Sequence, residues 1–190
     1  YIGNEAYSDC CSLASITVPN GVTYIGSGAF SGCSSLTSIT IPDSVTYLGS
    51  AFSGCSSLTS ITIPDGVTSI LGGMFSGCTS LIDITLPDSV TSIGRRAFSG
   101  CSSLTSITIP SGVTSIEGWT FEGCSSLTSV TILGKITNIR LYTFSECSNL
   151  ISITIPGSVT NIESNAFNGC SNLTDVYYGG SEEDWDSIPI

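Results

Sequence analysis

The sequence contains no histidine, only four basic residues and a single methionine among its 190 residues. Without histidine, neither a Ser-His nor a Cys-His nucleophile pair can form, although serine is abundant. Charged residues make up 10% of the chain, against about 25% in typical soluble proteins, and the formal net charge is −11. Nucleic acids require a basic footprint that such a chain lacks. We therefore expect no catalytic residues and no nucleic-acid partner.

Long apolar runs and metal-ligand motifs are also missing. No run approaches the roughly 18 apolar residues that a membrane-spanning helix needs, so we expect no membrane insertion. There are nine cysteines but no CxxC motif, and most successive cysteines are 23 residues apart, which cannot bring four thiolates to one metal ion. We therefore expect no metal and no cofactor. The acidic cluster near the end of the chain is interpreted as a solvated helix start, with weak Ca²⁺ binding as the alternative: Glu182, Glu183, Asp184 and Asp186.

The sequence is built from one repeated unit, LxxIxIPxxVxxIxxxAFxxCxx. All seven phenylalanines fall in one column of this template and eight of the nine cysteines fall in another. The spacing is constant except that one residue is missing before Ala51. A fixed period in this range predicts a solenoid in which each unit is one coil. The copies begin at Leu13 (partial), Leu36, Leu58, Leu81, Leu104, Leu127, Leu150 and Leu173 (partial).

Each coil is expected to have three parts. Alternating polar and β-branched residues, as in 38–41, predict a short strand, and copies should stack into a continuous parallel sheet. Proline then presets φ at the first position of a turn, followed by Asn, Asp or Gly. A Val-Thr-x-Ile segment predicts a second extended stretch, and residues such as 94–103 a loop or short helical turn. The fold class is therefore a right-handed, β-rich repeat solenoid of about eight 23-residue coils.

Two domains follow from where the repeat breaks. Residues 1–174 form the solenoid, with 1–12 as a partial first coil, and residues 175–190 form a C-terminal cap. Ser181 is expected to start a helix, and Trp185 and Ile188 to fold over the last core layer. The first coil edge should be exposed, as expected for an excerpt of a longer protein. Whether upstream coils or an anchoring domain belong to that protein is left open.

The cysteine column is expected to point inward as a ladder of buried free thiols. Stacked strands are about 4.8 Å apart, so disulfides are not excluded by distance. Parallel side chains that point into one core are poorly aimed at each other, however, and this favours free thiols. Cys11 lies outside the column and should be partly exposed.

The tandem units LTSITIPxSVTSIGxxAFSGCSS, closed by VYYGGSEEDW, resemble the BspA-type leucine-rich repeat family. The resemblance covers essentially the whole chain. It implies a leucine-rich-repeat solenoid from a secreted or surface-attached protein of bacteria or protozoa. Such proteins are associated with adhesion, so the resemblance implies an extracellular or cell-surface location. The expected partner is a protein or glycoprotein of a host matrix or another cell.

Two surfaces are candidates for binding. The first is the outward face of the predicted sheet, with the candidates Ser38, Thr40, Ser60, Thr62, Asp83, Thr85, Ser106 and Thr108. The second is an edge where variable residues of successive coils gather, with the candidates Arg95, Arg96, Trp119, Arg140 and Tyr142. Arg, Trp and Tyr are enriched at binding hot spots because they bury a large area at low entropic cost. The alternative is that Arg96 stacks over Trp119 and the side chains merely cover the loop.

Three non-enzymatic hypotheses therefore remain. The first is a surface-displayed binding or adhesion module, the second a structural spacer, and the third an ice-binding protein that uses the Ser-x-Thr array. Asp83 and Asp175 interrupt that array, which counts against the third. The oligomeric state and glycosylation of the Asn172 sequon are left open.

Overall fold

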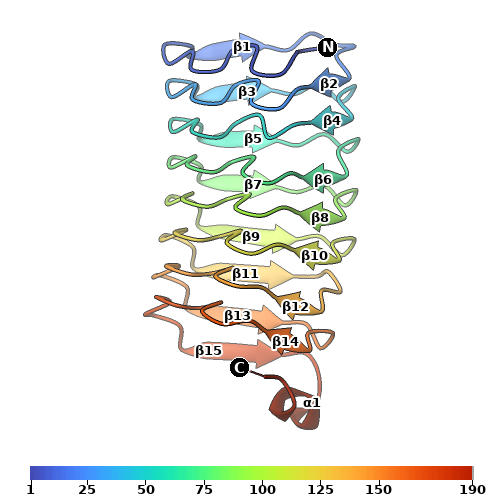
Figure 1. Cartoon of the computed structure of the whole chain (residues 1–190), viewed down its shortest axis with the longest axis vertical. Helices are drawn as coiled ribbons and strands as arrows, with labels where there is room; N and C mark the ends of the chain where they lie inside the picture. Colours follow the sequence, from blue (N-terminus) through green and yellow to red (C-terminus); the bar gives the residue numbers. More distant parts are fainter. Residues whose placement is uncertain (190) are drawn as a thin grey trace.

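The computed structural model describes residues 1–189, which form one elongated stack of parallel coils (Figure 1). Each coil contributes a longer strand and, after a turn, a two-residue strand. The longer strands are β1 (Ser15–Thr17), β3 (Ser38–Thr40), β5 (Ser60–Thr62), β7 (Asp83–Thr85), β9 (Ser106–Ile109), β11 (Ser129–Ile132), β13 (Ser152–Ile155) and β15 (Asp175–Tyr178). The short strands are β2 (Tyr24–Ile25), β4 (Tyr47–Leu48), β6 (Ser69–Ile70), β8 (Ser92–Ile93), β10 (Ser115–Ile116), β12 (Asn138–Ile139) and β14 (Asn161–Ile162). The chain closes with the helix α1 (Glu182–Asp186).

The strands pair in the register that the repeat predicts, but the sheet is not continuous. Ser15 faces Ser38, and Ser106 faces Ser129, which keeps identical columns side by side. The longer strands nevertheless form two sheets, β1-β3-β5-β7 and β9-β11-β13-β15. The prediction of one unbroken sheet is therefore wrong, and strand length changes from three residues to four across the interruption. The short strands also separate into groups, one boundary falling between β4 and β6, where the coil is shortened.

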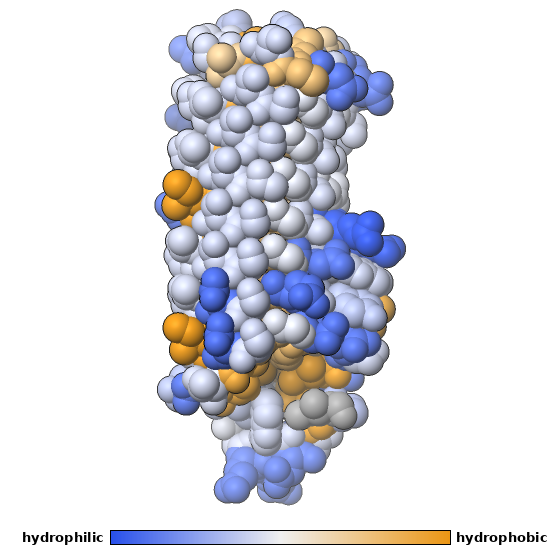
Figure 2. All heavy atoms as spheres, turned by 90° about the vertical axis from the view of Figure 1, so that its left-hand side faces the viewer, coloured by the Kyte–Doolittle hydropathy of each residue, from blue (hydrophilic) through white to orange (hydrophobic). Residues whose placement is uncertain are grey.

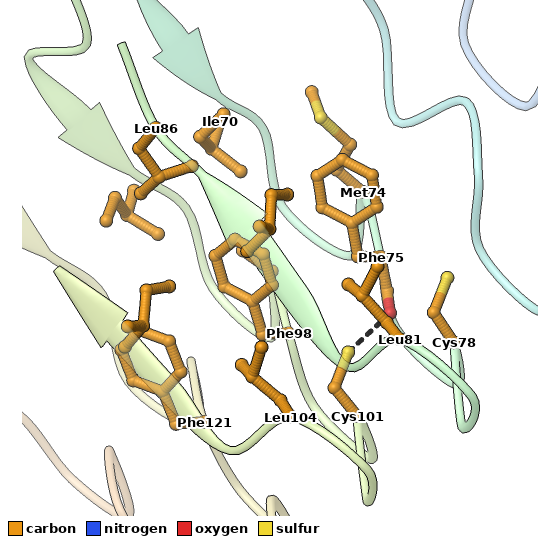
Figure 3. Close-up of a cluster of buried hydrophobic side chains, with 14 of the residues drawn as sticks. Ile70, Met74, Phe75, Cys78, Leu81, Leu86, Phe98, Cys101, Leu104 and Phe121 are labelled. Atoms are coloured by element: carbon orange, nitrogen blue, oxygen red, sulfur yellow. Dashed lines mark hydrogen bonds between the residues drawn. The ribbon is translucent and has the colours of Figure 1, made fainter. Parts of the chain in front are cut away.

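Phenylalanine rings form the centre of the core. Consecutive rings stack with centroids 5.4–5.8 Å apart and interplanar angles of 2–12°. Six of the seven are fully buried, whereas Phe167 in the last complete coil is half-buried. Offset stacking of this kind adds to the stabilisation from burial alone. Figure 3 shows how Phe75, Phe98 and Phe121 pack with the leucine and isoleucine columns.

The cysteine column forms a hydrogen-bonded ladder beside these rings. Each thiol donates to the carbonyl of an aromatic residue in the preceding coil, as Cys101 Sγ does to Phe75 O at 3.1 Å (Figure 3). The other members behave alike at 3.1–3.2 Å: Cys33, Cys55, Cys78, Cys124, Cys147 and Cys170. Burial raises the pKa of these thiols above its ordinary value, to about 12 for Cys55 and Cys101. The column therefore holds thiols that are both hydrogen-bonded and unreactive.

All nine cysteines are free, as predicted, but Cys10 and Cys11 lie outside the buried ladder. Cys10 was expected in the ladder and is exposed, because it belongs to the first coil and packs against only one neighbouring coil. Cys11 is exposed as expected.

The turns and loops follow the predicted order along each coil. The Val45 N–H donates to the Pro42 carbonyl at 3.0 Å, so proline is the first residue of the turn and Asp43 and Ser44 are its central pair. The segments that follow the short strands are successive turns in the described residues, with no helical turn among them. Of the two forms predicted for this segment, the loop is therefore the correct one.

The ends of the stack are only partly covered. Ser181 caps α1, and Ser181 and Asp184 form the reciprocal hydrogen bonds of a capping box, so the predicted helix start is confirmed. Ile188 is buried, but Trp185 is half-buried and Val176 is 43% exposed. The expected cap therefore covers only part of the last core layer, and Ile190 of that predicted cap lies outside the described residues. The first layer is likewise partly exposed, at Leu13 and Ile16. In the part of the chain that the structure describes, no helix is both long and apolar enough to cross a bilayer.

Candidate functional site: an arginine–aromatic edge

The candidate edge is built on a column of residues with left-handed backbone conformation. Each of these residues lies two positions before the aromatic residue of the phenylalanine column, and their φ angles lie between 55° and 67°. Between Gly28 and Gly73 the column has no member, so the residue missing from the shortened coil is the left-handed one itself. We call this set the left-handed column: Glu5, Gly28, Gly73, Arg96, Trp119, Tyr142 and Asn165.

Three large side chains therefore stand where glycine is the least strained choice. For a residue with a Cβ, the left-handed region costs roughly 1–2 kcal/mol. Arg96, Trp119 and Tyr142 each carry that cost on consecutive coils, whereas Gly28 and Gly73 avoid it. Sequence reasoning placed these residues in one column but missed the strain. The signal available was the column itself, in which glycine and asparagine, the residues that best tolerate this conformation, also occur.

The side chains of the edge stack on one another along the solenoid. The guanidinium carbon of Arg95 lies 4.2 Å from the Trp119 ring centroid, and that of Arg96 lies 5.9 Å away. The Trp119 and Tyr142 rings stack with centroids 5.5 Å apart and an interplanar angle of 25°. The next coil continues the contact, because Asn165 Nδ2 donates to the Tyr142 hydroxyl at 3.3 Å. The expected cation–π contact between Arg96 and Trp119 is present, but Arg95 lies closer to the Trp119 ring than Arg96 does.

The edge also gathers most of the positive charge of the chain. Three of the four basic residues lie there, Lys135 being the fourth. Arg96 Nε is 4.0 Å from Glu122 Oε2, and Arg140 Nε is 3.4 Å from Glu117 Oε2. These pairs are largely exposed and contribute only about 0–1 kcal/mol each, so they leave the arginines able to exchange partners.

Arg95 is distinct from the other two arginines. Within residues 1–189 it has no carboxylate within ion-pair distance, and its side chain is exposed. Figure 2 shows strongly hydrophilic atoms gathered over the middle and lower coils of this face, with further hydrophilic and apolar atoms at the two ends of the stack. The arginine–aromatic edge, defined by Arg95, Arg96, Trp119, Arg140 and Tyr142, therefore combines two ion-paired arginines with Arg95, which lacks such a partner among residues 1–189.

The candidates on the sheet face are exposed as predicted, but they do not form an uninterrupted array. All eight point outward from their strands, alternating with buried isoleucine or leucine. Where β7 and β9 fail to pair, a hollow of about 230 Å³ opens, with Asp83, Thr85, Ser106 and Thr108 among its lining residues. Leu133, 57% exposed, lies beside it. The hydroxyl face is thus divided into two parts.

The remaining sequence candidates are engaged in local structure. Asn172 Nδ2 of the sequon donates to the Ser148 carbonyl at 2.8 Å, which ties the acceptor nitrogen to the preceding coil. In the acidic cluster, the Asp184 carboxylate accepts from Ser181, and these hydrogen bonds lower the pKa of Asp184. Among the described residues, no group of three or more His, Cys, Asp or Glu side chains is placed to hold a metal ion.

A tyrosine stack is a further surface feature, and sequence reasoning missed it. Tyr1, Tyr24 and Tyr47 occupy one column at the short strands, and their rings stack with centroids 5.0 Å and 4.6 Å apart. Tyr1 is 80% exposed and Tyr47 is 42% exposed. The signal was present in the parallel segments YIG, YIG and YLG that begin at these three residues.

Comparison with known proteins identifies the repeat. The model of the BspA type leucine-rich repeat region matches residues 1–102 and 74–187, with six copies. A leucine-rich repeat protein from Bacteroides ovatus is 37% identical with a TM-score of 0.82, over 87% of this chain and 45% of that protein. The leucine-rich repeat protein of T. pallidum is 31% identical with a TM-score of 0.74, over 85% of this chain and 78% of that one. A leucine rich cell surface protein from Faecalibacterium prausnitzii is 27% identical with a TM-score of 0.48, over 98% and 79%. No curated protein matches the chain.

The chain therefore spans less than half the length of the Bacteroides ovatus protein that it matches. The fold and the repeat are shared with the Bacteroides ovatus and T. pallidum proteins.

Proposed function

The chain belongs to the BspA type leucine-rich repeat family, and on that premise we propose that it is a non-enzymatic binding module displayed at a cell surface or outside the cell. Its partner is a protein or glycoprotein of a host matrix or of another cell, and not a nucleic acid. A repeat module with a binding or structural role is what the family and the solved relatives support. Display and adhesion are the proposed refinement of that role.

One observation supports the arginine–aromatic edge as the place of contact. Arg96, Trp119 and Tyr142 occupy strained left-handed positions on three consecutive coils, where glycine would remove the strain. Backbone strain of this kind concentrates at functional sites, because selection for fold stability alone favours its removal. The same three residue types are the ones that dominate binding hot spots. Arg95, which has no carboxylate within ion-pair distance among residues 1–189, further favours a partner surface that supplies a carboxylate or another anion.

The experiment compares partner binding and stability in matched variants. Trp119→Ala with Tyr142→Ala removes the stacked rings, and Ser38→Ala with Thr40→Ala is the control pair on the sheet face. Binding to a panel of purified matrix glycoproteins and to intact cells is measured below the melting temperature of every variant. We expect the aromatic pair to lose at least tenfold in affinity, and the control pair to keep it. Full retention of binding with a lowered melting temperature would leave the edge without a recognition role.

A structural spacer is the second candidate, and one observation favours it. Trp119 is already in contact with Arg95 on one side and Tyr142 on the other, so the stack stabilises itself without a partner. If the edge only holds successive coils together, its variants lower the melting temperature and leave cell attachment unchanged. We do not propose ice binding, because the interruption between β7 and β9 divides the hydroxyl face.

A further inference from the structure

The tyrosine stack ends at its third ring, Tyr47, because the fourth coil has no aromatic residue in this column. Tyr24 and Tyr47 are paired in register on β2 and β4, and Tyr1 lies in the same column one coil earlier. In the next coil the column holds Ser69, so no ring follows Tyr47 in the stack. Adjacent coils are about 4.8 Å apart, so a fourth ring would lie against Tyr47 at the position of Ser69. Serine leaves that position without a ring.

That unfilled position coincides with a hollow in the surface. The strands β4 and β6 are not paired with each other: β4 belongs to the sheet β2-β4 and β6 to the sheet β6-β8-β10. The hollow has a volume of about 170 Å³ and is lined by Thr46, Tyr47, Leu48, Val67, Thr68, Ser69 and Leu71. It is smaller than the roughly 300–1,000 Å³ of a typical pocket for drug-sized ligands, and so suits a single ring.

The chemistry of the hollow is uncharged, with hydroxyls beside an aromatic face. Its polar side chains are Thr46, Thr68, Ser69 and the phenol of Tyr47, and none of its lining residues carries a charge. An aromatic face is the negative end of the ring quadrupole and attracts weakly positive C–H groups. Serine and threonine hydroxyls both donate and accept hydrogen bonds, which matches a ligand rich in hydroxyl groups.

We propose that this hollow is a subsite for one pyranose ring of a neutral saccharide, which takes the fourth position of the tyrosine stack. The C–H face of the sugar stacks on the Tyr47 ring, in the same way that the Tyr47 ring stacks on that of Tyr24. The hydroxyl groups of the sugar face Thr46, Thr68 and Ser69. Because the chain carries a net charge of −11, a neutral sugar is favoured over an acidic one at a position that has no arginine or lysine.

This subsite is separate from the arginine–aromatic edge and uses none of its residues. It goes beyond the proposed function, since a saccharide could be bound whether or not the edge recognises a protein. The two proposals therefore fail independently: variants of Tyr47 and Ser69 test the subsite, and variants of Trp119 and Tyr142 test the edge.

The test is an NMR titration of the isotope-labelled chain. The probes are cellohexaose, maltohexaose, mannohexaose and chitohexaose, with N-acetyltyrosinamide titrated in parallel as a protein-like ring. Tyr47→Ala removes the platform, Tyr47→Phe keeps the ring without its hydroxyl, and Ser69→Tyr fills the position from within by extending the stack. Ser115→Tyr is the matched control, because it makes the same change in the same column two coils further along.

We expect at least one neutral hexasaccharide to shift the resonances of Tyr47, Thr68 and Ser69 in a saturable way. Affinity should fall at least tenfold in Tyr47→Ala and Ser69→Tyr, and stay within threefold in Tyr47→Phe, Ser115→Tyr and the Trp119→Ala/Tyr142→Ala pair. Ser69→Tyr should keep or raise the melting temperature, so its loss of binding is not a loss of folding.

Three results would overturn the proposal. The first is that none of the four saccharides binds. The second is that Ser69→Tyr binds as well as the unmodified chain. The third is that N-acetyltyrosinamide alone gives shifts that depend on Tyr47, which would identify the hollow as a contact for a protein side chain.

Discussion

The buried thiol ladder predicts that the protein unfolds at alkaline pH, near pH 10 to 11. Cys55, Cys78, Cys101, Cys124 and Cys147 have fully buried side chains and strongly raised pKa values, and desolvation is the largest cause of the raised pKa of each. In the unfolded chain a thiol ionises near pH 9.0, whereas in the folded chain the pKa of Cys101 is about 12. The protonated thiols are therefore compatible with the fold, and their thiolates are not.

The sign and size of the effect follow from linkage. Because the folded pKa is raised, stability is complete below pH 9 and falls as the pH rises from 9 towards 12. At pH 10 each such thiol removes roughly 1 kcal/mol from the free energy of unfolding, and the five together several kcal/mol. Since domains are typically stable by about 5–15 kcal/mol, the fold should be lost near pH 10 to 11.

The assay is urea denaturation under reducing conditions at pH 7, 8, 9, 9.5 and 10, followed by circular dichroism. Above pH 9.5 the fall in the free energy of unfolding should approach about 6–7 kcal/mol per pH unit, the slope of five protons. Cys101→Ala with Cys124→Ala is the matched variant, and its slope should be about three-fifths as steep. A slope below two protons in the unmodified chain, or an equal slope in the double variant, would refute the thiol ladder as the cause.

Three further predictions concern the backbone and the thiols. Glu146 has φ 59° in a column of loop positions that are otherwise mostly glycine, so Glu146→Gly should be more stable than Glu146→Ala by about 1 kcal/mol in urea denaturation; equal stability would contradict strain at this position. A Cβ on Gly94 would lie 2.5 Å from a backbone nitrogen of the neighbouring coil, whereas one on Gly73 meets nothing within 4 Å. Gly94→Ala should therefore lower the free energy of unfolding by more than about 2 kcal/mol and Gly73→Ala by only about 1 kcal/mol, and the reverse order would be inconsistent with the packing of the coils. Thiol titration should return nine groups in denaturant but fast reaction of only two, Cys10 and Cys11, in the native protein; a denatured count near one would show disulfides.

Local patterning was enough to predict the coil. The isoleucines of 38–41 alternate with Ser and Thr. In an extended strand this period of two places the isoleucines on one face and the hydroxyl residues on the other. Phe and Cys recur at a fixed spacing, so stacking in register brings each column together without further information. The helix start at Ser181 could also be predicted from the sequence, because a capping box is a contact between residues three apart in the sequence.

Contacts between coils decided the features that the pattern did not contain. Nothing in the identity of Trp119 indicates a φ of 61°, because the conformation is imposed by the coils on either side and is opposed by the side chain itself. The separation of β7 from β9 depends on how the strands of neighbouring coils are spaced, and the repeated sequence is nearly the same on both sides of it. The hollow after Tyr47 falls where the coil is one residue short and Ser69 replaces tyrosine, so the sequence marked the place but not the hollow itself. The periodic sequence by itself therefore determined which side chains point inward and which columns stack. Only the tertiary structure decided where the stack is strained or interrupted, because those properties arise from small differences in fit that accumulate between coils.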